Sequence, residues 1–254
     1  MRTYKAKYFL SMFFCLFISA TLSSAQEKIK INFDNKASIK DWEFIDEAPK
    51  NLGDAGPSTW EIKKGPLDGN SLFQGSNIWG SKADTCLMGT FAIYKAEKFR
   101  EFTIEMDVFA ADNDGIGITW AYESTKKHYR VIMINDGWPE VPVDKIKGPF
   151  MKIQKRVSDD KPWYELITAE KGITYKEQAP LHWKFEVKGG EFKLTREDNK
   201  IIKGADKEYE EGYIGIQLYA QQGHFDNIVI ENTWAVDPRK KVSTTWAQIK
   251  KDHN

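Results

Sequence analysis

Apolar and polar residues alternate along much of this chain, most clearly between residues 99 and 136. Apolar residues occupy every second position in three runs, at 102–108, 116–122 and 129–133. Strict alternation is typical of strands that have one face in a core and the other toward water. Polar, turn-forming segments at 112–115 and 123–127 separate the runs. The pattern therefore predicts a three-stranded antiparallel meander.

The register of this meander follows from keeping apolar residues opposite one another. Met106 is then paired with Trp120, and Trp120 with Val131. The alternate positions would form one polar face carrying Glu105, Asp107, Glu123, His128 and Arg130. We take this predicted charged patch as the first candidate site.

Further short apolar runs are spaced about ten residues apart on both sides of the meander. They lie at 28–34, 59–62, 71–74, 85–95, 150–157, 163–169, 181–187, 191–196, 212–219 and 224–231. Gly189-Gly190 predicts a tight hairpin turn, and the last two runs are expected to pair with each other. Segment 36–54 is expected to be irregular. Many short strands separated by turns predict an all-β fold, an antiparallel two-sheet β-sandwich of the jelly-roll kind.

The first 25 residues have the features of an export signal. Arg2, Lys5 and Lys7 precede a short apolar run, and small residues end at Ala25. We expect cleavage near Ala25, a secreted or periplasmic protein, one domain at 26–234 and a basic tail at 235–254. Only Cys86 would remain after cleavage, so no internal disulfide is expected.

Charge and composition narrow the function classes. Lys plus Arg and Asp plus Glu both number 37, and removal of the signal would leave the chain slightly acidic without a basic stripe. Nucleic acid is therefore not an expected partner. No second apolar stretch is long enough to span a membrane after signal cleavage. Nine Trp residues suit a sandwich core or a surface that contacts sugars.

A series of short motifs resembles the concanavalin A-like jelly roll, especially its laminin G-like and thrombospondin C-terminal-like domains. The motifs are Trp60, Gln74-Gly75-Ser76-Asn77, Phe99-x-x-Phe102-Thr103, Asp112-x-Asp114-Gly115-x-Gly117-Ile118, Tyr129-Arg130-Val131, Gly212-x-Ile214-Gly215-Ile216 and Phe225-Asp226-Asn227. The resemblance covers about residues 28–232. It implies binding of carbohydrate or glycoprotein, often with a structural calcium ion, and some members are glycosidases or polysaccharide lyases. These motifs are mostly structural and indicate a fold better than an activity.

Binding of a polysaccharide or cell-surface glycan is the function we expect. Trp79 and Trp138 lie in loops with Gly or Pro neighbours, where their rings could stack on a sugar. The predicted charged patch would supply the polar contacts. Loop anchoring for the two Trp residues and a solvated salt-bridged face for the patch are the simpler alternatives.

Catalysis on the same fold is the main alternative, and a structural or adhesion module is another. Glu105 and Asp107 match two positions of the Glu-x-Asp-x-Glu strand of related glycoside hydrolases, but Phe109 occupies the third. His128 and Arg130 could serve a lyase as base and carboxylate-neutralising cation, although the usual lyase motifs are absent.

Calcium is the one cofactor that the sequence suggests. Phe33-Asp34-Asn35 and Phe225-Asp226-Asn227 are near-duplicates in the first and last predicted strands. In the fold that the chain resembles, these strands commonly lie side by side. Asp34 and Asp226 could then share one Ca²⁺ with backbone carbonyls, or they could be ordinary Asx turns.

Overall fold

Strands make up nearly all of the regular structure. The computed structural model describes residues 28–47, 53–54, 56–79, 89–137, 145–157, 164–172 and 175–234. Within these ranges there are fifteen strands and one 3-10 helix, η1 (Lys36–Asp41). The predicted all-β class and antiparallel two-sheet sandwich are confirmed.

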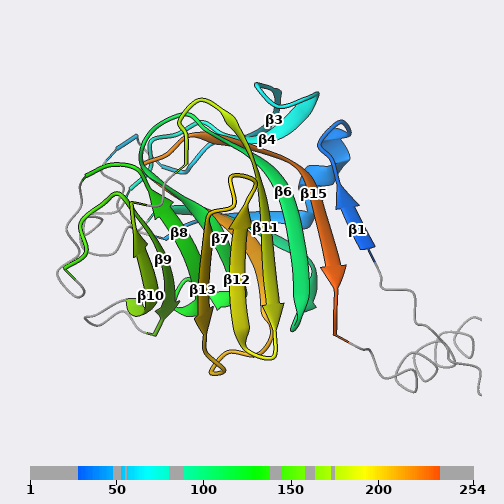
Figure 1. Ribbon diagram of the computed structural model, residues 1–254. Coiled ribbons are helices and arrows are strands. Elements are labelled where there is room, and N and C mark those ends of the chain that lie inside the picture. Colours follow the sequence, from blue (N-terminus) through cyan, green and yellow to red (C-terminus); the bar gives the residue numbers. More distant parts are fainter. Residues whose placement is uncertain are drawn as a thin grey trace, which may run out of the picture.

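Eight strands form the first sheet, which we call sheet A. Its order is β13-β12-β11-β6-β15-β4-β3, and β1 also pairs with β15. Figure 1 shows β1 lying beside β15 at one side of the molecule. The strands are β1 (Lys28–Ile31), β3 (Trp60–Lys64), β4 (Asn70–Gln74), β6 (Phe102–Ala110), β11 (Pro180–Lys188), β12 (Glu191–Arg196), β13 (Ile201–Ala205) and β15 (Gly223–Asn232).

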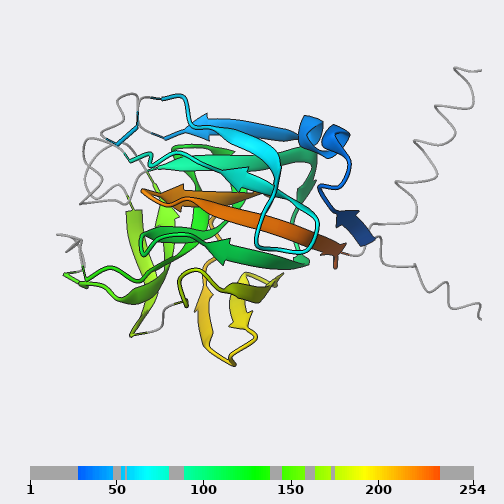
Figure 2. The ribbon, with the colours of Figure 1, turned by 90° about the horizontal axis from the view of Figure 1, so that it is seen from above.

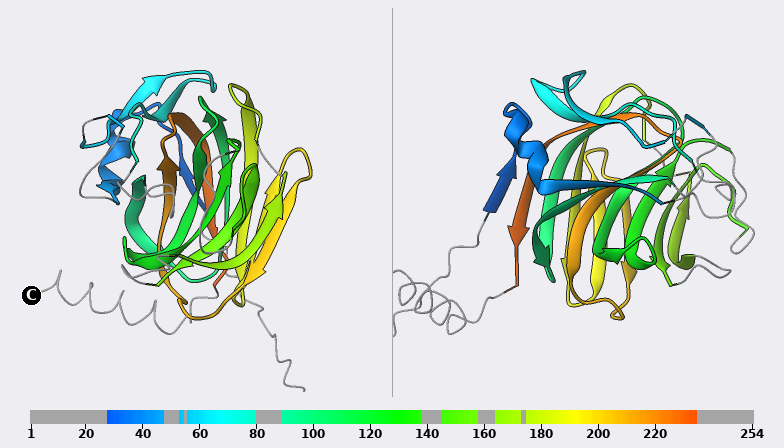
Figure 3. Two further views of the ribbon diagram at one scale, coloured as in Figure 1. Left: turned by 90° about the vertical axis from the view of Figure 1, so that its left-hand side faces the viewer. Right: turned by 180° about the vertical axis from the view of Figure 1, so that it is seen from behind.

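Seven strands form the second sheet, sheet B, in the order β10-β9-β8-β7-β14-β5-β2. The two sheets face each other as layers, seen from above in Figure 2 and from two further sides in Figure 3. The strands are β2 (Trp42–Asp46), β5 (Thr90–Phe99), β7 (Gly115–Ser124), β8 (Lys127–Ile134), β9 (Phe150–Arg156), β10 (Tyr164–Lys171) and β14 (Gly212–Tyr219).

One large apolar core fills the space between the sheets. In β6 and β11 buried residues alternate with partly exposed ones, as expected for strands with one wet face. Trp120 on β7 contacts Phe185 on β11 and Phe192 on β12, with ring centroids 4.6 and 4.8 Å apart. Such contacts join sheet B to sheet A at the centre of the core.

The predicted three-stranded meander is wrong at its first turn. β6 lies in sheet A, whereas β7 and β8 lie in sheet B. Met106 therefore pairs with Trp183 on β11 instead of Trp120, and it shares the core between the sheets with Trp120. Alternation predicts which face of a strand is buried, but it does not predict the neighbouring strand. Two strands with matching apolar faces can pair within one sheet, or they can pack against each other from opposite sheets of the sandwich. The same error affects the last two strands, because β14 is in sheet B and β15 in sheet A.

The second turn of the meander is confirmed, but its register is not. β7 and β8 are paired, with Trp120 opposite Tyr129 instead of Val131. The register shifts between Trp120 and Ser124, where Ala121 has a positive φ of 46°. This bulge turns Tyr122 away from the core and onto the other face of sheet B, where it packs with Phe91.

The hairpin predicted at Gly189-Gly190 is confirmed. It joins β11 to β12, and both glycines have positive φ values, 61° and 81°. In the ranges that the structure describes, no helix has the length and apolar character needed to cross a membrane.

Candidate functional site

The centre of sheet B is buried on both of its faces. Every residue of β9, and every residue of β8 except Lys127, is buried. One face packs into the core, and we call the other the outer face of sheet B. An outer face is normally exposed to water, but this one carries buried charged and amide side chains. Because buried polar groups are unfavourable unless they are hydrogen-bonded, this face is the candidate site.

Arg130 lies at the middle of the outer face of sheet B. Its Nε donates to Gln154 Oε1 at 2.9 Å, and its Nη1 donates to Gln217 Oε1 at 3.2 Å. The guanidinium carbon is 3.5 Å from the ring centroid of Tyr164. The three partners come from β9, β14 and β10. Two hydrogen bonds and one stacked ring therefore fix the plane of a fully buried guanidinium group.

A chain of three hydrogen-bonded side chains continues from Tyr164. The Tyr164 hydroxyl lies 2.8 Å from His128 Nε2 and 3.0 Å from Glu47 Oε1. On the far side of the imidazole, Nδ1 is 2.9 Å from the backbone carbonyl of Ser124. Among the described residues, Glu47 Oε2 is buried without a geometric hydrogen bond, although the backbone N–H of Gly89 interacts with this carboxyl group and opposes the rise in its pKa.

The hydrogen bonds and the pKa shift of His128 indicate which nitrogen of its imidazole carries the proton. A carbonyl only accepts, so His128 Nδ1 carries a proton toward Ser124. Burial lowers the pKa of His128 to about 3, which leaves Nε2 bare as an acceptor. Burial also raises the pKa of Glu47, although the charges of Arg130 and Arg156 oppose this. The Tyr164 hydroxyl donates to Glu47 Oε1 at 3.0 Å and lies 2.8 Å from the bare Nε2 of His128.

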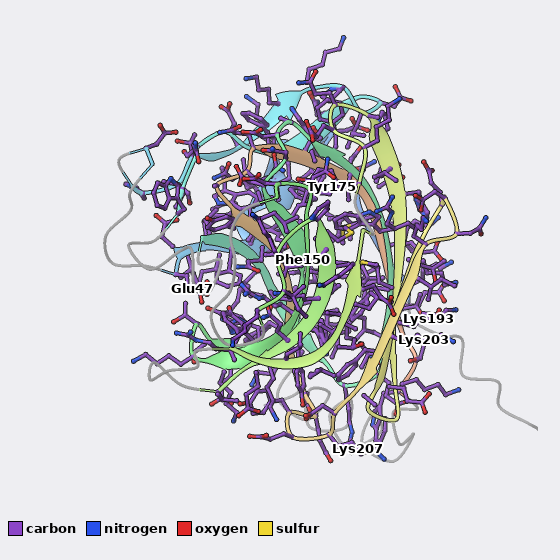
Figure 4. The ribbon with its side chains drawn as sticks, turned by 60° about the vertical axis from the view of Figure 1, so that its left-hand side comes forward. Glu47, Phe150, Tyr175, Lys193, Lys203 and Lys207 are labelled. Carbon is purple, nitrogen blue, oxygen red and sulfur yellow. The ribbon has the colours of Figure 1, made fainter. Side chains whose placement is uncertain are left out.

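Rings and aliphatic side chains flank this polar centre. On one side Trp79 packs, partly buried, against a cluster formed by Ile132, Ile134, Phe150, Tyr219 and Ala220. On the other side lie Phe91, Ile93 and Tyr122. Figure 4 shows Glu47 and Phe150 on the side of sheet B, away from Lys193 and Lys203 on β12 and β13. Polar planar groups between aromatic rings are typical of ligand sites.

The predicted charged patch does not share one face, because β6 and β8 belong to different sheets. Only His128 and Arg130 lie on the outer face of sheet B. Glu105 and Asp107 point outward from β6 on sheet A. A single ligand cannot contact both pairs across the core, so the prediction of one continuous patch is wrong.

Glu105 and Asp107 form cross-strand pairs on the exposed face of sheet A. Asp107 Oδ1 is 2.8 Å from His182 Nδ1, and its Oδ2 accepts from Asn227 at 2.7 Å. Glu105 pairs with Lys184 at 3.1 Å. Side chains here are about 30–40% exposed. This arrangement fits the solvated, salt-bridged alternative for this half of the patch.

The other predicted contact residues are separated from one another. Glu123 is an exposed residue near the end of β7 that pairs with Lys127 at 2.6 Å. Trp79 lies on the outer face of sheet B, in the ring cluster described above. Trp138 lies outside the described residues. Trp79, His128 and Arg130 thus form the part of the predicted site that the structure brings to one face.

Asp34 and Asp226, the predicted calcium ligands, are brought toward each other by the pairing of β1 with β15. Asp226 is 3% exposed and its Oδ1 has no hydrogen-bond partner. Burial raises the pKa of Asp226, backbone hydrogen bonds from Asn227 and Phe33 oppose this, and the charges of Asp34 and Asp107 raise it further. Among the described residues, no three or more His, Cys, Asp or Glu side chains are grouped to hold a metal. A cation here would need carbonyl or water oxygens as well.

Three residues of the candidate site were missed by the sequence analysis: Glu47, Gln154 and Tyr164. Glu47 lies within segment 36–54, which was expected to be irregular, and it directly follows β2 of sheet B. Gln154 lies in the run FMKIQKR, in which only residues 151–154 alternate between apolar and polar. The sequence feature that could have identified such residues is a long polar side chain within a strand that lies at the centre of a sheet.

Comparison with known proteins supports the fold. No protein-family model and no curated protein matches the sequence. A Bacillus subtilis protein described as having a galectin-like fold and unknown function has a TM-score of 0.53 at 9% identity, covering 80% of this chain and 94% of its own. The protein therefore has a galectin-like β-sandwich fold. The narrower resemblance to laminin G-like and thrombospondin C-terminal-like domains stays a prediction.

Two other solved structures have lower scores. The carbohydrate-binding module CBM66 from Bacillus subtilis has a TM-score of 0.49 at 16% identity, covering 75% of this chain and 95% of its own. A toad ovary galectin in complex with thio-digalactose has a TM-score of 0.41 at 11% identity, covering 52% of this chain and 91% of its own.

Proposed function

We propose that this protein is an exported carbohydrate-binding β-sandwich that holds a polysaccharide or cell-surface glycan on the outer face of sheet B. The observation that carries the proposal is the set of planar polar groups gathered on that face between aromatic rings. The central groups are Arg130, Gln154, Gln217, His128, Tyr164 and Glu47. Export rests on the N-terminal signal expected from the sequence.

The chemistry of these groups suits a sugar. Sugar hydroxyls both donate and accept, and guanidinium, amide and carboxyl groups present donors and acceptors in fixed planes. The C–H faces of a sugar ring pack on aromatic rings, which Trp79 and Phe150 supply beside the polar centre. His128, Arg130 and Gln217 are fully buried in this structure.

Binding should depend on the amide of Gln154. We expect Gln154→Ala to weaken glycan binding about tenfold or more, because an oxygen that orients Arg130 is lost and a tenfold change corresponds to about 1.4 kcal/mol. The measurement is a glycan array followed by titration calorimetry on the best ligand, with the melting temperature recorded for each variant.

Lys193→Ala is the matched control, since this side chain lies on the exposed face of sheet A and pairs with Glu186. It should leave the affinity unchanged. The proposal would be contradicted if the array showed no ligand, or if Lys193→Ala weakened binding as much as Gln154→Ala.

We also propose that Ca²⁺ binds between Asp34 and Asp226. The buried, unpartnered Oδ1 of Asp226 supports this, because a cation would offset the burial and the neighbouring negative charges that raise its pKa. In this role Ca²⁺ would join β1 to β15 and have no part in glycan contact.

A chelator should therefore lower the melting temperature, and added Ca²⁺ should restore it. A domain of this size changes its melting temperature by about 2–4 °C per kcal/mol, so the shift is measurable by calorimetry. Asp226→Asn should remove the response to chelator. An unchanged melting temperature in wild-type protein would rule out the calcium site.

A further inference from the structure

Three turns at one end of the sandwich surround a small cavity, which we call the end pocket. They are the turn between β5 and β6, the β11–β12 hairpin at Gly189-Gly190, and the loop between β13 and β14. The end pocket has a volume of about 230 Å³. Figure 4 shows Lys207, one of its lining residues, at the lower end of the molecule and away from Glu47 and Phe150. The end pocket is therefore separate from the outer face of sheet B.

Hydrogen bonds hold these turns together. Glu101 Oε1 accepts from the backbone N–H of Gly189 at 2.9 Å, and the N–H of Asp206 donates to the carbonyl of Gly190 at 3.0 Å. The chain that follows β15 joins the same end, because the N–H of Thr233 donates to the carbonyl of Glu101 at 2.9 Å. The walls of the end pocket are therefore fixed by the protein itself, as is usual for ligand sites.

Trp234 places an exposed ring beside the end pocket. Among the described residues, Trp234 and Ile201 are the large apolar side chains that remain exposed, by 42% and 40%. The Arg100 guanidinium group lines the end pocket, lies 4.1 Å from the Trp234 ring centroid and pairs with Glu210 at 2.8 Å. A sugar ring has an apolar C–H face and hydroxyl groups at its edge, so it can contact the indole and these polar groups together.

The charges that line the end pocket are balanced. They are two cations and three carboxylates: Arg100, Lys207, Glu101, Asp206 and Glu210. Asp206 already accepts from Lys155 at 3.1 Å and from the Tyr129 hydroxyl, so both of its oxygens are occupied. Two cations and two carboxylates remain. A charged ligand would be repelled by one of these pairs, whereas hydroxyl groups can donate to the carboxylates and accept from the cations.

We propose that the end pocket is a second carbohydrate-binding site, which takes a single neutral sugar unit at the end of a glycan. Its volume is below the about 300–1,000 Å³ of sites that hold drug-sized ligands, which suits one sugar ring. Val187 and Phe192 give it an apolar lining. The inference goes beyond the proposed function, because this site lies on other elements than the outer face of sheet B and can bind independently of it.

The test labels the tryptophans of the full mature chain with fluorine and follows them by NMR. The spectrum of Trp234→Phe identifies the Trp234 resonance. D-glucose, D-galactose, D-mannose and L-fucose are added as neutral sugars, with D-glucuronate, D-glucosamine and glycine as charged comparisons. At least one neutral sugar should shift the Trp234 resonance, and titration calorimetry with that sugar gives its affinity.

Trp234→Ala should weaken binding of that sugar about fivefold, which is the scale of one aromatic contact. Lys207→Ala should also weaken it, because a donor is lost from the lining. Ile201→Ala is the matched control, since it removes an equally exposed apolar side chain from β13. It should leave the affinity unchanged. The melting temperature of each variant shows that the fold is retained.

The outcomes separate this inference from the proposed function. An affinity that falls with Gln154→Ala and not with Trp234→Ala would overturn the end pocket and place the sugar on the outer face of sheet B. Shifts caused only by the charged compounds would overturn the neutral class of ligand. Equal weakening by Ile201→Ala and Trp234→Ala would also count against the site. If no sugar shifted the Trp234 resonance while a glycan array still showed a ligand, the end pocket would be overturned and the proposed function would stand.

Discussion

Truncation of Trp120 to alanine should lower the free energy of unfolding by about 3–5 kcal/mol, a large part of the 5–15 kcal/mol typical of a domain. Trp120 is 1% exposed, and its ring contacts Tyr129 on its own sheet and Phe185 and Phe192 on the opposite sheet. The loss would leave a cavity where the two sheets meet. Urea denaturation of wild-type and variant protein measures the difference.

Trp234→Ala is the control, because Trp234 is 42% exposed and contacts the Arg100 guanidinium group at the surface. It should cost about 1 kcal/mol or less. Trp120→Phe should fall between the two, since it keeps a ring and removes an indole N–H that has no hydrogen-bond partner. Equal losses for Trp120→Ala and Trp234→Ala would contradict the position of Trp120 at the centre of the core.

Acid should destabilise the protein through His128. The pKa of His128 is lowered from 6.5 to about 3 by burial, so below pH 6.5 the unfolded chain binds a proton that the folded protein does not. The stability gained from the neutral imidazole is full above pH 6.5 and is lost as the pH falls toward 3. By linkage the loss between pH 7 and about pH 4 is about 3 kcal/mol.

His128→Gln should remove that part of the acid sensitivity, because an amide can replace both hydrogen bonds and does not titrate. The free energy of unfolding is measured at several pH values for wild-type and variant protein. His224 contributes in the same direction, since burial lowers its pKa to about 4, and His224→Gln separates its smaller share. If His128→Gln and wild-type protein lost stability in parallel with acid, the buried neutral imidazole would be ruled out.

The sequence predicted most of the strands, but it missed β2 and β13 and did not predict which strands pair. Alternation located β6, β7 and β8, and Gly189-Gly190 identified the β11–β12 hairpin. Whether β6 paired with β7 or faced it across the core depended on a corner after residue 110, which the apolar pattern does not encode. Tyr122 was also misplaced by the apolar pattern. Its spacing from Trp120 predicted a position in the core, but the bulge at Ala121 places it on the outer face of sheet B.

The candidate site was predicted only in part for a related reason. His128 and Arg130 were identified because they are polar residues on a clearly alternating strand. Tyr164 on β10 and Glu47, directly after β2, are 36 and 81 positions away from His128 in the chain. Their approach depends on the strand order of sheet B, which places β10 and β2 at its opposite edges. No local spacing could indicate that contact.

Because the chain alternates between the two sheets, strands that are distant in the sequence must pair, and this affects the rate of folding. Sheet B can complete its centre only when β14, near the C-terminal end of the domain, pairs with β7 and β5. Contacts between such distant segments carry a large loop-closure entropy, and they make folding slow, on the order of milliseconds to seconds. A ribosome-bound chain that ends before residue 212 would still lack that strand. The outer face of sheet B should therefore become competent to bind only after synthesis of nearly the whole domain.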